Sequence, residues 1–304
     1  MSVTFLIGAG ASKGHGKPEA PLGNKLGGCL RKHYPAFENI EKQTQSRCED
    51  DFEEWTKSIG DDGEAFTLSL IVTGHFFRRF NPISQDSLYF KLIDSIPPGK
   101  LASTSFISLN YESLLEQAIR HRNYSIDWGS TDLIYDYFNF PCPRKPIKVL
   151  KPHGSANFIA TGAHMFEAGS VVIDITSNLK AGTVVIDPTS EHSSKAYLPV
   201  ISAYEKEKRS PFNAHFIDEI RSNTLSTAET TDTLVIIGVR FTPEDKFLPS
   251  IYEKLPKGCR ILYIGSEDDF KGYQQEYSDH FVVEHVSCFF TANSAEKLSN
   301  MLWS

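Results

Sequence analysis

The sequence lacks the cysteine patterns that mark disulfide-rich and zinc-binding proteins. Its five cysteines are odd in number and include no Cys-x-x-Cys pair. Neither a disulfide framework nor a structural zinc site is therefore predicted. Scattered single thiols are typical of reduced cysteines in a cytosolic protein. We expect a cytoplasmic protein whose site holds no metal.

Long apolar runs and an excess of positive charge are missing as well. The apolar stretch Val3–Ile7 is shorter than the core of a signal peptide, and no basic segment precedes it. No apolar run approaches the roughly 20 residues that a membrane-spanning helix needs. The 31 Lys and Arg against 38 Asp and Glu give a net charge of −7. This net negative charge gives no sign of the basic surface that non-specific nucleic-acid binding requires. Neither a membrane nor a nucleic acid is expected as a partner.

Short, almost continuously apolar runs recur along the chain, bounded by Gly, Pro, Asn or Asp. They are typical of strands in a parallel sheet that is covered on both faces. The clearest runs are Val3–Ile7, Ser105–Leu109, Ile147–Leu150, Val171–Ile175, Thr183–Ile186, Leu234–Ile237, Arg260–Ile264 and Phe281–Val286. Because helical patterns alternate with these runs, we predict one α/β domain over residues 1–304, Rossmann-like and doubly wound around a mostly parallel sheet.

Helical periodicity dominates between the first and second predicted strands. One face at helical spacing carries Phe66, Leu70, Thr73 and Phe77. We therefore predict a helical insertion at about residues 35–95. A further helix is predicted after Asn110, and its inward positions are Leu114, Leu115, Ala118 and Ile119.

A glycine-rich segment, Gly8-Ala9-Gly10-Ala11-Ser12, directly follows the first predicted strand. Such a turn between strand and helix lets backbone N–H groups approach a pyrophosphate closely. Lys13 stands where the dehydrogenase fingerprint has its third glycine, which argues against a Rossmann dehydrogenase. We expect these five residues to bind a phosphate or nucleotide; a plain tight turn is the alternative.

Two polar residues stand where other predicted strands end. Asn110 follows Ser105–Leu109 and precedes a helix, so it is either a site residue or the helix N-cap, a role that asparagine fills well. His153 follows Ile147–Leu150 and precedes Gly154. It is a candidate general base because histidine titrates near neutral pH. The alternative is a histidine hydrogen-bonded within the wall of a loop.

Two later strands lead into glycines. Leu234–Ile237 is followed by Gly238-Val-Arg240, where Arg240 is a candidate phosphate contact or a surface salt bridge. Arg260–Ile264 is followed by Gly265-Ser266, a weaker candidate for contact with an adenosine ribose. Ligands of doubly wound folds bind at the carboxyl ends of the strands, so we expect these residues to lie around one site.

Taken together, the motifs resemble the sirtuin family. They occur in the order Gly8–Ser12, Asn110-Tyr-Glu, Lys151-Pro-His-Gly-Ser155 and Ile236-Ile-Gly238. The resemblance is closer to the zinc-free, sirtuin-like NAD-hydrolase domains of bacterial antiphage defence proteins. It implies that Gly8–Ser12 cradle NAD, that Asn110 holds a water near the nicotinamide ribose and that His153 is the catalytic histidine. With the strand ends described above, the remaining candidate NAD contacts are Gly154, Ser155, Gly238, Arg240, Gly265 and Ser266.

Several departures separate the sequence from the sirtuin deacetylases. Gly16-Lys-Pro-Glu-Ala-Pro replaces Gly-Ile-Pro-Asp-Phe-Arg, Leu109 replaces the glutamine before the asparagine, and the zinc-binding Cys-x-x-Cys pairs are missing. These changes remove parts associated with acetyl-lysine recognition and keep parts that contact NAD. The resemblance therefore favours hydrolysis of NAD to nicotinamide and ADP-ribose.

We accordingly expect an NAD⁺ glycohydrolase that depletes NAD in antiphage defence. The resemblance implies control by homo-oligomer assembly or by a separate partner chain such as a ring-forming HerA-type ATPase. Two alternatives stay open. One is a catalytically silent sensor or assembly subunit that binds NAD or ADP-ribose, and the other is a zinc-free NAD-dependent protein deacylase or ADP-ribosyltransferase.

Overall fold

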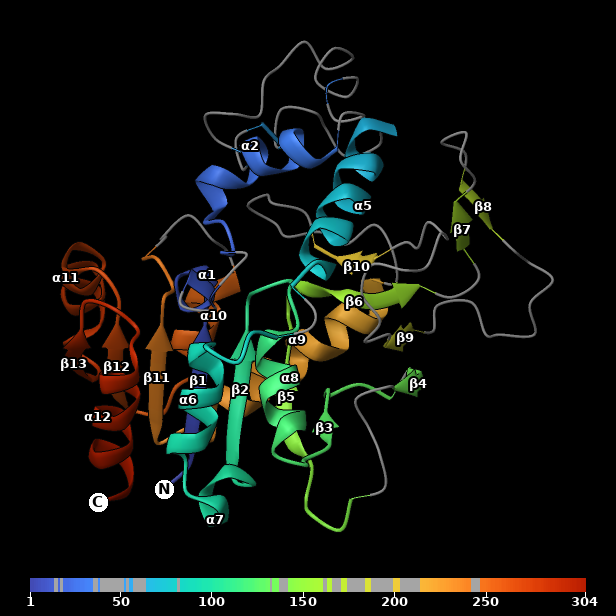
Figure 1. Cartoon of the computed structure of the whole chain (residues 1–304). Helices are drawn as coiled ribbons and strands as arrows, with labels where there is room; N and C mark the ends of the chain where they lie inside the picture. Colours follow the sequence, from blue (N-terminus) through green and yellow to red (C-terminus); the bar gives the residue numbers. More distant parts are fainter. Residues whose placement is uncertain are drawn as a thin grey trace.

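A seven-stranded parallel sheet forms the centre of the fold (Figure 1). The computed structural model describes residues 1–13, 16, 19–34, 38, 52, 55–56, 64–80, 83–131, 133–136, 142–160, 163–165, 171–173, 184–186, 199–202, 214–241 and 247–304. The strand order is β13-β12-β11-β1-β2-β5-β3. Their bounds are β1 (Val3–Ile7), β2 (Thr104–Ser108), β3 (Ile126–Asp127), β5 (Ile147–Leu150), β11 (Thr233–Ile237), β12 (Arg260–Ile264) and β13 (Val282–Ser287).

The register of the central strands brings their carboxyl ends to one edge. Ile7 of β1 is paired with Ser108 of β2 on one side and with Ile237 of β11 on the other. All residues of β1 and β11 are buried. Continuous burial requires apolar residues on both faces of a strand, which explains the unbroken apolar runs in the sequence. The predicted Rossmann-like, doubly wound parallel sheet is confirmed.

Helices cover both faces of this sheet. Their bounds are α1 (Ala9–Ser12), α2 (Gly23–His33), α5 (Glu64–Arg78), α6 (Leu88–Ser95), α7 (Pro98–Leu101), α8 (Leu114–His121), α9 (Ala214–Ala228), α10 (Phe247–Glu253), α11 (Glu267–Tyr277) and α12 (Ala292–Trp303). Helix α6 packs between α8 and α12, in front of the strands in Figure 1, whereas α9 lies behind them and contacts β5 and α10. Among the described residues, no helix is long and apolar enough to cross a membrane.

Helix α8 begins three residues later than an N-cap role for Asn110 requires. Its inward positions Leu114, Leu115, Ala118 and Ile119 are all buried, as predicted. Its N-cap, however, is Ser113. The N-cap alternative for Asn110 is therefore wrong. The segment between β2 and α8 forms a short loop at the carboxyl edge of the sheet.

Two of the predicted strands lie outside the parallel sheet. Strand β9 (Val184–Ile186) belongs to a four-stranded sheet of order β10-β6-β9-β4, with β4 (Leu133–Asp136), β6 (Gly154–Ala160) and β10 (Pro199–Ile201). Strand β8 (Val171–Ile173) pairs antiparallel with β7 (Ala163–Met165). Strand β9 pairs in parallel with β4 and antiparallel with β6. The placement of these two strands in the central parallel sheet was therefore wrong, because a short apolar run does not reveal its pairing partner.

The helices from the predicted insertion take two different positions. Helix α5 contacts α2 and the strands β6 and β10, above the strand tips in Figure 1. Helix α6 instead joins the layer of helices that covers the parallel sheet. Parts of the range 35–95 lie outside the described residues. A separate insertion with those boundaries stays a prediction.

Candidate active site

A cavity of about 520 Å³ lies at the carboxyl ends of β1, β2, β5, β11 and β12. From β1 the sheet continues to β2 on one side and to the late strands β11, β12 and β13 on the other. The strand order thus changes direction beside β1, the position where doubly wound folds bind ligands. The cavity is lined by these predicted site residues: Gly8, Ala9, Gly10, Ser12, Asn110, His153, Gly238, Arg240, Gly265 and Ser266.

The side-chain amide of Asn110 is held by three groups at the floor of this cavity. Its Nδ2 lies 3.0 Å from the Gly8 carbonyl oxygen, 2.9 Å from Ser12 Oγ and 3.2 Å from the Tyr89 hydroxyl. A carbonyl oxygen only accepts hydrogen bonds, so the atom that faces Gly8 must be the nitrogen. In the described part of the chain, Oδ1 of Asn110 accepts no hydrogen bond. This oxygen is therefore available to a ligand in the cavity.

Behind Asn110, a buried hydroxyl connects two more side chains. The Ser12 hydroxyl donates to Glu112 Oε1, so its oxygen accepts from Asn110 and from the Tyr89 hydroxyl, which lies 2.9 Å away. Burial raises the pKa of the Tyr89 hydroxyl well above its ordinary value, and the carboxyl group of Glu112 adds to this effect. Tyr89 therefore stays a neutral phenol. The orientation of Asn110 is fixed by this network before any ligand binds.

Glu112 is a buried carboxyl group with competing influences on its ionisation. Burial raises the pKa of Glu112 above the ordinary value of 4.5, and the neighbouring Glu116 acts in the same direction. The positive charge of Lys151, the Ser12 hydroxyl and the Leu114 amide lower it. The net shift is upward, so folding makes the carboxyl group of Glu112 easier to protonate than it is in the unfolded chain.

Lys151 joins the Asn110 loop to the His153 turn. Its Nζ lies 2.6 Å from the Glu112 carbonyl oxygen and 2.7 Å from Glu116 Oε1. Both charged side chains are 0% exposed. The lysine of the Lys-Pro-His motif therefore has a structural role: it neutralises Glu116 and fixes the loop that carries Asn110.

His153 is buried in the wall of the same cavity. Its side chain is 6% exposed, and its ring lies 6.3 Å from the ring of Phe247. The backbone around it is fixed, because the His153 carbonyl accepts from the Ser202 amide at 2.8 Å and the Pro152 carbonyl accepts from Arg221 at 3.1 Å. Asn110 and His153, which are 43 residues apart in the sequence by their numbers, thus face one cavity.

The two glycine segments of the site pack backbone against backbone. A Cβ atom on Gly8 would lie 2.6 Å from the Gly238 carbonyl oxygen, and one on Gly10 would lie 2.7 Å from Gly238 Cα. Gly238 itself has φ +62°, and a Cβ atom there would lie 2.3 Å from the Ala11 nitrogen. Only glycine fits these positions, because any side chain would push the two loops apart.

Three of the five backbone amides predicted to hold a phosphate are already hydrogen-bonded within the chain. The amide of Gly8 donates to the Ile237 carbonyl, that of Gly10 to the Gly238 carbonyl and that of Ala11 to the Gly8 carbonyl. The glycine segment therefore offers fewer free N–H groups than its five residues could supply, and its role in holding a phosphate stays a prediction. Two cationic side chains, Lys13 and Arg240, also line the cavity and are exposed.

Three predicted contacts are not part of the cavity lining: Ala11, Gly154 and Ser155. Gly154 has φ +78°, and a Cβ atom there would lie 2.1 Å from the Val200 carbonyl oxygen. Ser155 is fully buried and donates to the Tyr111 carbonyl at 3.1 Å. Ala11 is buried beneath the glycine loops. Gly154 and Ser155 therefore connect β6 to its neighbours and support the turn of His153.

The far wall of the cavity, beside β12 and β13, is mostly exposed, with Asp269 partly buried. It includes Ser266, Asp269, Cys288 and Phe289. Ser266 is the N-cap of α11 and accepts a hydrogen bond from the Asp269 amide. Phe289 is 73% exposed. Sequence reasoning identified Ser266 from its position after a strand, but gave no reason to single out the other three.

Solved structures with similar folds include Sir2 proteins. A Sir2 homologue in complex with NAD is 12% identical, with 98% of this chain and 88% of that chain covered and a TM-score of 0.49. A Sir2 homologue mutant in complex with ADP-ribose is 11% identical, with 98% and 90% covered and a TM-score of 0.47. A Sir2 protein bound to a propionylated peptide is 10% identical, with 99% and 92% covered and a TM-score of 0.41. No protein-family model matches the sequence, and no curated protein matches it.

Proposed function

We propose that the chain is an NAD⁺ glycohydrolase that cleaves the bond between nicotinamide and ribose. The observation that carries the proposal is the fixed side-chain amide of Asn110 in the lining of a cavity that His153 also lines. An acceptor oxygen of fixed orientation suits a ribose hydroxyl or a water molecule near the reactive carbon. A histidine in the same wall is suited to accept the proton that this water loses.

The size and position of the cavity support a dinucleotide as the ligand. Its volume of about 520 Å³ lies within the ~300–1,000 Å³ typical of small-molecule and cofactor sites. The cavity extends from Asn110 and His153 past β1 and β11 to Ser266 and Asp269 at the end of β12. We place the nicotinamide ribose at the buried end and the adenosine ribose at Ser266 and Asp269. Lys13 and Arg240 then face the pyrophosphate between them.

The proposed reaction needs no cofactor other than the substrate. NAD⁺ and water give nicotinamide, ADP-ribose and a proton. The pyridinium leaving group departs with the electron pair of its bond to the ribose carbon, and it is then neutral. Positive charge that develops on the ribose is met by the oxygen of Asn110. Water forms the new bond to the same carbon, and His153 accepts its proton.

Water is the proposed acceptor because the sequence lacks motifs associated with acyl-lysine recognition. Residues 16–21 read Gly-Lys-Pro-Glu-Ala-Pro, and no Cys-x-x-Cys zinc pair is present. We further propose, from the sequence resemblance, that NAD depletion serves antiphage defence and that assembly or a partner chain controls it. Light scattering with and without a candidate partner, run beside the NAD assay, tests that control.

The test is liquid chromatography of NAD⁺ incubated with the purified chain and with two variants. We expect the natural chain to release nicotinamide and ADP-ribose in equal amounts. Asn110→Ala and His153→Ala should each lower turnover by about 10²- to 10⁴-fold. Asn300→Ala and His280→Ala are matched controls, because both side chains are exposed and neither lines the cavity.

Two results would contradict the proposal. One is unchanged turnover in a folded Asn110→Ala variant, which would remove the proposed role of this residue. The other is the lack of any calorimetric signal for NAD⁺ or ADP-ribose with the natural chain. Binding without turnover, with or without partners, would instead favour a sensor.

A further inference from the structure

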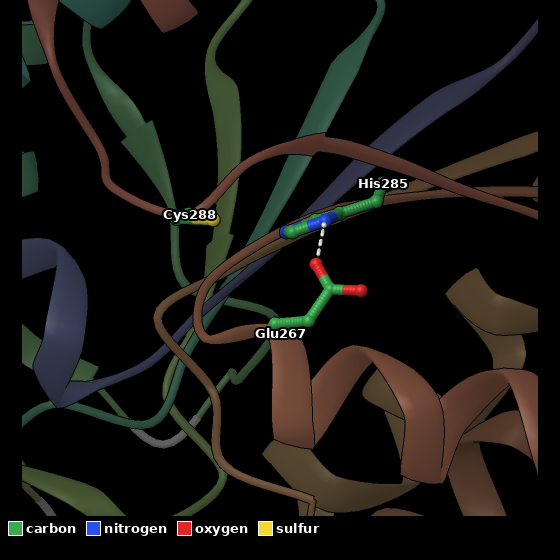
Figure 2. A group of neighbouring side chains, drawn as sticks. All are labelled: Glu267, His285 and Cys288. Atoms are coloured by element: carbon green, nitrogen blue, oxygen red, sulfur yellow. Dashed lines mark ion pairs between the residues drawn. The ribbon is translucent and has the colours of Figure 1, made fainter.

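Three side chains with metal-binding atoms gather beside the exposed wall of the cavity. Glu267 is the first residue of α11, His285 lies in β13 and Cys288 follows that strand. One ligand atom from each residue lies within 4.8 Å of the others. Figure 2 shows the three side chains converging from the helix, the strand and the loop after it. The connection from β12 through α11 to β13 brings them together.

The polar contacts of His285 are both satisfied only if a positive charge lies next to its ring. Its Nε2 lies 3.0 Å from the Gly265 carbonyl oxygen. A carbonyl oxygen only accepts, so Nε2 carries a hydrogen and Nδ1 has the lone pair in the neutral ring. Nδ1 lies 3.1 Å from Glu267 Oε2, which also only accepts when ionised. Two such atoms repel each other unless a proton or a metal ion lies between them.

The separation of these two atoms matches two ligands on one ion. Bonds of about 2.0–2.1 Å from zinc to nitrogen and oxygen place the two ligand atoms 3.1 Å apart at an angle of roughly 100°, close to tetrahedral. The His285 ring is also held for such a role, because it stacks on Phe270 with ring centres 4.7 Å apart. A histidine ligand whose second nitrogen donates to a backbone carbonyl is the usual arrangement in metal sites.

We propose that Glu267, His285 and Cys288 bind a divalent transition-metal ion, with Zn²⁺ as the best match. A thiolate disfavours Mg²⁺ and Ca²⁺, whereas Cys, His and carboxylate together suit zinc. The His285-x-x-Cys288 spacing equals that of the Cys-x-x-Cys half of zinc sites. The positive end of the α11 dipole opposes a cation, but the acidic residues of its first turn, Glu267, Asp268 and Asp269, offset this effect.

The ion would connect the cavity wall to helix α11. Cys288 is exposed and lies on the segment Cys288–Phe290, which lines the cavity. Three protein ligands leave a fourth position for water or for a donor group of a ligand. The position of this segment is therefore expected to depend on the ion, whatever ligand the cavity binds.

Competition titration of the metal-free chain with Zn²⁺ and a chromophoric chelator tests the site, after removal of any histidine tag. We expect one tight zinc equivalent per chain. Cys288→Ser and His285→Gln should each weaken binding at least tenfold, and Glu267→Gln should weaken it less. Cys142→Ser and His280→Gln are matched controls that should bind zinc as the natural chain does. With Co²⁺ as the probe, a thiolate-to-cobalt charge-transfer band should appear and be lost in Cys288→Ser.

Two outcomes would overturn the site. Binding of less than one zinc equivalent by the natural chain would mean that His285 and Glu267 are only a side-chain pair and not metal ligands. Equal affinity in Cys288→Ser and the natural chain, with no charge-transfer band, would place the metal elsewhere. Cys288 is exposed, so its replacement should not impair folding, and a melting curve checks this. None of these readouts depends on NAD⁺ turnover.

Discussion

The two walls of the cavity differ in how much of their chemistry is fixed by the fold. On the buried wall, Ser12 and Glu112 are each 2% exposed and Asn110 is 8% exposed, and hydrogen bonds connect all three. On the far wall, Ser266 and Cys288 are exposed, and Phe289 is 73% exposed. Buried polar networks are costly to break, whereas exposed polar groups contribute little until a ligand orders them. Substitutions in the buried wall should therefore affect folding and turnover. Substitutions in the far wall should mainly affect the affinity for the ligand.

The largest effect on stability is expected from Lys151→Met. The substitution keeps most of the volume of the side chain but removes the charge that faces Glu116, and both groups are 0% exposed. Removing one partner of a buried ion pair typically costs about 3–5 kcal/mol, because the other charge stays buried. Urea unfolding of the two proteins measures the difference in free energy of unfolding.

Lys254→Met is the matched control for this experiment. Lys254 pairs with Glu229 at 2.8 Å, but the two side chains are 48% and 50% exposed. Exposed pairs contribute about 0–1 kcal/mol, so this variant should unfold almost as the natural chain does. A similarly small loss for Lys151→Met would mean that burial does not make this ion pair more costly to break than an exposed one.

A pH-dependent effect is expected from Glu112→Gln. Because burial raises the pKa of Glu112, its contribution to stability is fully present below the ordinary value of 4.5 and is lost as the pH rises through the raised value. Glutamine has the same shape and does not ionise. The variant should therefore gain stability relative to the natural chain as the pH rises above 4.5. Urea unfolding at several pH values measures this difference, and a difference that falls with pH would mean that the ionised form is favoured.

The architecture was largely predictable from the sequence because the central strands are buried on both faces. The unbroken apolar runs Val3–Ile7 and Leu234–Ile237 predicted β1 and β11 to within one residue. Pairing was not predictable, because the same kind of run at 183–186 forms a strand of the smaller sheet. Local sequence reports burial and periodicity, whereas the choice of sheet depends on distant contacts.

The candidate site was predictable where a residue stands at the end of a strand, as Asn110 and His153 do. Tyr89 was missed because its hydrogen-bond partner Ser12 is 77 residues away, and nothing near Tyr89 in the sequence indicates that contact. Lys151 has a signal in the sequence, a cation next to a buried strand, but the sequence does not show that it pairs with Glu116. The proposed metal ligands were missed because Glu267 lies on a separate helix from the His285-x-x-Cys288 pair.

The smallest effect is expected on the exposed side, from Arg240→Ala. Arg240 is exposed and lines the cavity beside Gly238, where we place the pyrophosphate. A charge contact in solvent contributes about 0.2–1 kcal/mol, so the KM for NAD⁺ should rise by at most roughly fivefold with kcat nearly unchanged. Lys254→Ala removes another exposed cation, one that does not line the cavity, and should leave both constants unchanged. Steady-state kinetics at two salt concentrations measures the effect, which should shrink at high salt. A fall in kcat with unchanged KM would place Arg240 at the reacting bond rather than at the phosphates, and the two walls would then share the chemistry.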